Sequence, residues 1–110
     1  MLKSPGLSAL GSTEKTYRAF REIAAERNRQ EIIHADKPER DPTLPLAARL
    51  DIYFKVLAEE VGELAETFLT DNKPERHTPE ARHKEALHVA AVGCAILELL
   101  SEQEPLTHPV

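Results

Sequence analysis

Hydrophobic residues recur with helical spacing in three segments of the chain, and proline- and glycine-containing stretches lie between and around those segments. The first segment predicts a helix that begins near Ser12, a good N-cap residue, and runs to about His34. Its apolar positions recur at spacings of three and four, which predicts one narrow buried stripe. The stripe consists of Tyr17, Phe20, Ile23 and Ala24.

The second segment has the clearest pattern in the sequence, because its apolar residues alternate between spacings of four and three. This is the seam of a helix packed in a bundle. Pro45 can open this helix, and Asp71-Asn72, just before Pro74, mark its expected end. The preceding residues 35–45 contain three prolines and predict a connecting loop rather than an element. The seam consists of Leu50, Phe54, Leu57, Val61, Leu64 and Phe68.

The third segment has a compact start signal, with Thr78 as N-cap, Pro79 at the first helical position and Glu80 just inside. Residues 86–100 are apolar nearly all round, so we expect this helix to be enclosed on several sides until Pro105 ends it. Small side chains along it should allow close approach of neighbouring backbones. They are Ala90, Ala91, Gly93, Cys94 and Ala95.

These patterns predict an all-α fold with three main helices per chain. A chain of 110 residues is too short to enclose the third helix by itself. We therefore expect a homodimer, or a dimer of dimers, in which the second and third helices complete a four-helix bundle. We expect residues 12–104 to form a single all-α domain, between flexible tails at residues 1–11 and 105–110.

Composition narrows the functional classes. The net charge of −5 disfavours binding to a nucleic-acid backbone. No segment approaches the roughly 20 apolar residues that span a membrane. Cys94 is the single cysteine and predicts a buried thiol, which fits a reducing, cytoplasmic location. The sequence has no glycine-rich phosphate loop and no cysteine pairs for zinc.

Four glutamates on the second predicted helix lie opposite its apolar seam. Neighbours three or four residues apart repel one another by a few tenths of a kcal/mol per pair. Lys55 lies one turn before Glu59 and can pair with it, so a solvated acidic face explains the pattern without a site. The four are Glu59, Glu60, Glu63 and Glu66.

Glu85 and His88 on the third predicted helix favour a metal site. They are three residues apart on a face that continues into Val92 and Leu99, so ligand-type residues adjoin a buried stripe. A charge near an apolar interior is costly unless it is paired or bound to metal. Carboxylates suit Mg²⁺, Mn²⁺ or Ca²⁺, and an imidazole moves the preference toward Mn²⁺, Fe²⁺ or Zn²⁺.

At these residues the sequence resembles the MazG-like all-alpha nucleoside triphosphate pyrophosphohydrolases, whose signature is EExxE on one helix and ExxD on the next. Here the two words read EEVGE at 59–63 and EALH at 85–88. The flanking words LAEEVGELAE at 57–66 and EALHVAAVGCAILELL at 85–100 are also similar to that family, as is the ERxRQ stretch at 26–30. The resemblance covers about residues 20 to 100.

The resemblance implies that Glu59, Glu60, Glu63 and Glu85 bind Mg²⁺ and carry catalysis, in which a nucleoside triphosphate yields a monophosphate and pyrophosphate. His88 departs from it, because that family usually has aspartate there and imidazole is a poor ligand for Mg²⁺. Three outcomes are open: activity with weak Mg²⁺ or with Mn²⁺, a transition-metal site, or a degenerate site in which His88 donates a hydrogen bond to Glu85.

Candidate phosphate-binding residues are Lys55, which precedes the acidic motif by one turn, and Arg27 and Arg29 in the first helix. Ordinary surface pairing of the arginines with Glu22, Glu26 or Glu31 is an equal alternative. Two other functions compete with hydrolysis. One is a di-iron or di-manganese carboxylate protein, because such bundles use glutamates with ExxH motifs. The other is a catalytically degenerate dimeric helical module.

Overall fold

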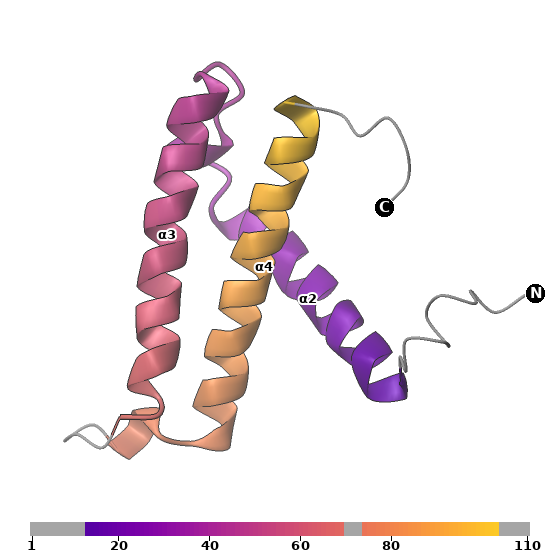
Figure 1. Cartoon of the computed structure of the whole chain (residues 1–110), viewed down its shortest axis with the longest axis vertical. Coiled ribbons are helices and arrows are strands. Elements are labelled where there is room, and N and C mark those ends of the chain that lie inside the picture. Colours follow the sequence, from indigo (N-terminus) through magenta and orange to yellow (C-terminus); the bar gives the residue numbers. More distant parts are fainter. Residues whose placement is uncertain (1–12, 70–73, 104–110) are drawn as a thin grey trace, which may run out of the picture.

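The computed structural model of the chain describes residues 13–69 and 74–103, and this part contains helices and turns but no strand. The all-α class is therefore confirmed for these residues. Figure 1 shows α3 and α4 side by side, with α2 crossing α4 at an angle. The elements are α2 (Glu14–Ile33), the 3₁₀ turn η1 (Pro38–Arg40), α3 (Leu46–Glu66), the 3₁₀ turn η2 (Pro74–Arg76) and α4 (Pro79–Gln103).

The starts of the helices follow from their caps. Thr13 caps α2, because its Oγ1 accepts a hydrogen bond from the Thr16 backbone N–H at 3.3 Å. The expected cap Ser12 lies outside the described residues. The start of α4 is confirmed, since Thr78 Oγ1 accepts from the Ala81 N–H at 3.1 Å and Pro79 is the first helical residue.

Helix α3 ends at Glu66, well before the predicted end at Asp71-Asn72, which falls outside the described residues. Thr67 follows the helix, and its Oγ1 donates to the Leu64 carbonyl at 2.6 Å. The Thr67 carbonyl accepts from Arg82 Nε at 3.0 Å. The last turn thus closes on a local hydroxyl and on a guanidinium from α4, neither of which the apolar pattern of α3 could indicate.

The predicted loop at residues 35–45 contains an element, so the prediction of an irregular connection is wrong at η1. Its Glu39 is 7% exposed, and that carboxylate accepts from Arg40 Nη1 at 2.8 Å. Arg49 of α3 donates to the Glu39 carbonyl at 2.9 Å. These polar contacts hold the turn against α3 without apolar side chains, which is why a hydrophobic pattern does not reveal it.

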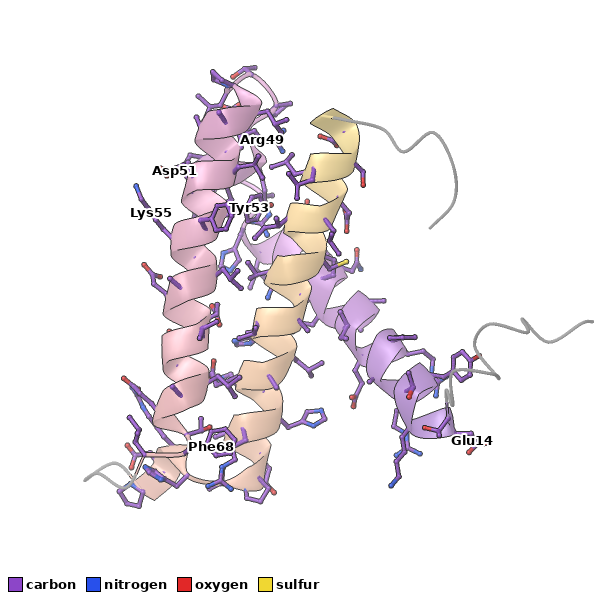
Figure 2. The ribbon with its side chains drawn as sticks, viewed as in Figure 1. Glu14, Arg49, Asp51, Tyr53, Lys55 and Phe68 are labelled. Carbon is purple, nitrogen blue, oxygen red and sulfur yellow. The ribbon has the colours of Figure 1, made fainter. Side chains whose placement is uncertain are left out.

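The apolar core lies between α3 and α4, in the half of the pair nearer Pro45 and Gln103. Apolar side chains from both helices meet there and are removed from water. Figure 2 shows Tyr53 projecting from α3 toward α4 within this half. The core consists of buried Tyr53, Val92, Ala95, Ile96 and Leu99, with Leu46, Leu50, Val56 and Leu57 packed against it.

The predicted seam of α3 is only partly buried within one chain. Phe54, Val61 and Phe68 are 62%, 47% and 63% exposed, because α4 packs on the neighbouring face that carries Tyr53 and Val56. Figure 2 shows Phe68 near the end of α3, where the guanidinium of Arg82 lies 4.9 Å from the ring centre. We call the row formed by Phe54, Val61 and Phe68 the outer face of α3.

The other predicted apolar surfaces are also more open than expected. Tyr17 and Phe20 on α2 are exposed, because the N-terminal half of that helix leans away from the α3–α4 pair (Figure 1). Leu97 and Leu100 on α4 are exposed, so α4 is not enclosed on several sides by this chain. A Cβ added at Gly93 would meet nothing within 4 Å, so the expected close backbone approach is not seen there.

The predicted tails at residues 1–11 and 105–110 lie outside the described residues, and so does Pro105. Within the described ranges, no helix combines the length and the apolar character that crossing a bilayer requires.

Candidate metal centre

The other half of the α3–α4 pair brings four ligand-type side chains together. Glu60 and Glu63 come from α3, and Glu85 and His88 come from α4, each pair three residues apart on its helix. One ligand atom from each residue lies within 4.8 Å of the others. We call these four residues the acidic cluster. The two helices are held in register for it by the apolar core at their other end.

His88 lies at the centre of the acidic cluster. Its Nδ1 is 3.2 Å from Glu60 Oε2 and 3.4 Å from Glu85 Oε2. Its Nε2 is 3.6 Å from an oxygen of Glu26, which belongs to α2. The His88 side chain is 16% exposed, so one mostly buried imidazole faces carboxylates from all three helices.

Two oxygens of the cluster lack a hydrogen-bond partner. Glu60 Oε2 and Glu85 Oε2 are both enclosed, and neither accepts a hydrogen bond in the described part of the chain. Leaving a buried carboxylate oxygen unpaired costs about 1–3 kcal/mol or more. Both oxygens lie beside His88 Nδ1, so two lone-pair donors and an imidazole nitrogen converge on the same space. A cation placed there would satisfy all three.

The pKa of Glu63 reflects this crowding. Burial raises the pKa of its carboxyl, and the neighbouring charges of Glu60 and Glu85 raise it further. The pKa of Glu26 is lowered instead, chiefly by a hydrogen bond from Arg29, although burial opposes that shift. The carboxylates of α3 and α4 thus lack a positive partner other than His88, whereas Glu26 of α2 is already neutralised by Arg29.

Glu26 is a residue that sequence reasoning assigned to ordinary surface pairing. Its side chain is 11% exposed and accepts hydrogen bonds from Arg29 and from Gln30 Nε2. A signal was present in the sequence, because Ile23, Glu26 and Gln30 lie at helical spacings of three and four. The buried face of α2 therefore continues from apolar residues into polar ones that face the cluster.

Glu59 does not join the acidic cluster, although the EExxE word includes it. It is exposed and lines an adjoining pocket between α2, η1, α3 and α4, which Glu60 also lines. Of the five residues predicted as metal ligands, Glu59 therefore lies apart, and the other four come together with Glu26 close behind.

The predicted phosphate-binding residues are engaged elsewhere. Lys55 pairs with Asp51 at 3.1 Å rather than with Glu59, and Figure 2 shows both side chains on the far side of α3 from α4. Arg27 binds Glu31 and, through two nitrogens, Glu98. Arg29 binds Glu26 through two hydrogen bonds of 2.8 Å. Both arginines thus follow the alternative prediction of ordinary ion pairing, Arg27 with Glu31 and Arg29 with Glu26.

The donor set fits a divalent cation. Three carboxylates supply hard oxygen ligands, and one imidazole supplies a nitrogen, which favours Mn²⁺ or Fe²⁺ over Mg²⁺. The unpaired oxygens of Glu60 and Glu85 show that the protein itself does not complete the coordination of these groups. A protonated His88 is the competing cation for the same space.

Three hollows adjoin the acidic cluster. The first, of about 460 Å³, shares His88 with the cluster and is also lined by Glu26 and Lys84. The other two lie at opposite ends along α3. One, of about 340 Å³, is lined by Glu63, Thr67, Arg76, Lys84 and Glu85. The other, of about 280 Å³, shares Glu60 with the cluster and extends toward Tyr53, Val56 and Val92. A ligand centred on the cluster therefore has room on both sides.

Comparison of the chain with protein-family models, with curated proteins and with solved structures finds no match. The properties of the site therefore follow from its own residues.

Proposed function

We propose that the protein is a metal-dependent nucleoside triphosphate pyrophosphohydrolase of MazG-like type, with a divalent cation held by Glu60, Glu63, Glu85 and His88. One observation supports this above the others: two enclosed carboxylate oxygens and an imidazole nitrogen converge from two helices without hydrogen bonds among them. That arrangement is costly for a protein with no ligand there. The reaction class comes from the resemblance of the EExxE and ExxH motifs to those of the MazG-like pyrophosphohydrolases.

The reaction is the attack of water on the α-phosphorus, which forms a P–O bond, breaks the bond to the β-phosphate oxygen and releases pyrophosphate and a proton. A bound divalent ion supplies charge for the phosphate oxygens and lowers the pKa of water. Glu63 is the exposed member of the cluster, so it is the carboxylate that an attacking water can reach to give up that proton.

Lys84 replaces Lys55 as the candidate phosphate-binding cation. It immediately precedes Glu85 on α4 and lines the hollow that contains Glu63 and Glu85. No ion pair involves it in the described part of the chain, so its ammonium group can meet a phosphate. Arg76 lines the same hollow but pairs with Glu66.

A homodimer belongs to this proposal. The outer face of α3 leaves two phenylalanines and a valine largely exposed, and Leu97 and Leu100 of α4 are exposed as well. A second copy packed there would complete a four-helix bundle from α3 and α4 of both chains.

One observation favours a second candidate, a di-manganese or di-iron carboxylate protein. His88 and Glu85 form an ExxH pair that faces carboxylates of α3, which is the ligand pattern of such bundles. Elemental analysis of the purified protein separates the two, because stoichiometric iron with no nucleotide hydrolysis would favour the second.

The test of the proposed function is a nucleotide panel assayed for pyrophosphate release with Mg²⁺ or Mn²⁺. Wild type should be active with Mn²⁺, and His88→Asp should shift the preference toward Mg²⁺. Removing an enclosed ligand in Glu60→Gln should lower activity by at least about 100-fold. The matched variant is Asp51→Asn, an exposed carboxylate on the far side of the same helix, which should retain activity within about threefold.

Calorimetry with Mn²⁺ alone gives a second readout, in which Glu60→Gln loses binding and Asp51→Asn keeps it. Wild type that releases no pyrophosphate from any nucleotide above the Glu60→Gln background would rule out the proposed hydrolase.

A further inference from the structure

The pocket that shares Glu60 with the acidic cluster contains two buried polar side chains with unused hydrogen-bonding groups. It has a volume of about 280 Å³ and lies where the end of α2, η1 and the middle of α3 meet α4. Neither polar side chain belongs to the acidic cluster. Their open groups are therefore available to a ligand group other than the metal and its phosphates.

Tyr53 is the first of these side chains. It is 4% exposed, and its ring packs beneath the guanidinium of Arg40 at 5.7 Å. Its hydroxyl makes no hydrogen bond in the described part of the chain, yet it is not one of the fully enclosed unpaired atoms. The hydroxyl therefore reaches open space, and Tyr53 lines this pocket. A phenylalanine would pack equally well, so the core does not account for the hydroxyl.

Gln30 is the second. It is 6% exposed, and its Nε2 donates to Glu26 Oε2 at 3.0 Å. A carboxylate can only accept, so this bond fixes which end of the amide faces Glu26. The Gln30 Oε1 is left as an acceptor without a protein donor, in a side chain that lines the same pocket.

The charge around the pocket suits a neutral group. Lys37 and Arg40 line it together with Glu39, Glu59 and Glu60, so carboxylates outnumber cations by one and a further anion is disfavoured. Arg40 is occupied by Glu31 and Glu39, each at 2.8 Å. Val56, Val92 and the Tyr53 ring supply apolar walls. A flat ring with an N–H edge fits these walls and this acceptor, whereas a phosphate does not.

We propose that this Gln30–Tyr53 pocket binds the nucleoside end of the substrate, with Gln30 Oε1 accepting from an N–H group of the base and the Tyr53 hydroxyl hydrogen-bonding beside it. The inference rests on the proposed function, since the cluster must hold the phosphates. The hollow that contains Lys84 lies near Thr67, and the Gln30–Tyr53 pocket lies near Val56. The helical rise from Val56 to Thr67 is about 16 Å. The substrate would thus lie along α3.

Tyr53→Phe tests the proposal, because it removes one oxygen that the folded chain does not use. We expect unchanged stability, unchanged Mn²⁺ binding and a KM for the best nucleotide raised about three- to tenfold, with kcat within about twofold. Tyr17→Phe is the matched control, since Tyr17 is the other tyrosine and lies exposed on α2. Gln30→Met should raise KM similarly, while Arg29 continues to bind Glu26.

Binding of the nucleoside monophosphates without metal separates the failure of this proposal from the failure of the proposed function. If wild type hydrolyses nucleotides and both variants match it in KM, the pocket assignment is overturned and the hydrolase stands. If no nucleotide is hydrolysed, weaker monophosphate binding by Tyr53→Phe still supports the pocket. Absence of monophosphate binding in wild type overturns it.

Discussion

The two halves of the α3–α4 pair are built from the same helices, but one buries apolar side chains and the other gathers carboxylates. Toward Pro45, Tyr53 of α3 meets Val92, Ile96 and Leu99 of α4 in a dry core. Toward Thr78, the facing positions carry the acidic cluster, where two enclosed oxygens lack partners. The apolar half stabilises the fold, and this stabilisation offsets the repulsion between the like charges in the acidic half.

The largest expected effect comes from breaking the apolar half. Leu99→Ala removes a side chain that is 4% exposed and should lower the free energy of unfolding by about 2–5 kcal/mol. Urea unfolding followed by circular dichroism measures it. Ile32→Ala is the control, because Ile32 is 70% exposed on α2 and should change stability by less than about 0.5 kcal/mol. Equal effects from both substitutions would show that the core is not where we place it.

An intermediate effect is expected at the outer face of α3, which is apolar along both halves. Phe54→Lys should weaken self-association at least about tenfold, or 1.4 kcal/mol, because the dimer would bury an unpaired ammonium. Sedimentation equilibrium measures the change. Phe20→Lys is matched to it in residue type and similar in exposure, but it lies on α2 and should leave association unchanged. A wild-type chain that sediments as a monomer at all concentrations would contradict the dimer.

The smallest effect concerns the charge in the acidic half. The pKa of Glu63 is raised above its usual 4.5, so the folded chain holds that proton more tightly than the unfolded chain does. Stability without metal should therefore rise as the pH falls from neutral through the raised pKa. Below about pH 4.5 it should fall again, because the pKa values of Glu26 and Glu31 are lowered.

Glu63→Gln isolates that contribution. It should raise the stability of the metal-free protein at pH 7 by a few tenths of a kcal/mol and flatten the rise between neutral and mildly acidic pH. The measurement is the urea midpoint across that range, with Glu59→Gln as the control. A destabilised Glu63→Gln would mean that the carboxylate has a favourable partner in the folded chain.

The sequence predicted the helices better than their contacts. The starts at Thr78 and Pro79 were confirmed because a cap is a local feature, written in adjacent residues. The end of α3 was misplaced because the Arg82 guanidinium that binds the Thr67 carbonyl comes from another helix. The element η1 was missed because polar contacts hold it, and these leave no hydrophobic period.

The candidate site was likewise predicted well within each helix and less well between helices. Spacing on one helix placed Glu60 with Glu63, and Glu85 with His88, and the structure brings the two pairs together. Spacing could not decide that Glu59 faces away, because adjacent residues on a helix differ by about 100°. Nor could it reveal Glu26, whose position depends on the angle at which α2 crosses α4 (Figure 1).

The position of His88 has a consequence for how this sequence can change over evolutionary time. Its imidazole touches a carboxylate on each of the three helices, Glu26, Glu60 and Glu85. A substitution at 88 therefore alters the electrostatic environment of all three helices in one step, whereas a change at any one glutamate removes only one of the three carboxylates around His88. We expect residue 88 to covary with all three glutamates among relatives of this chain.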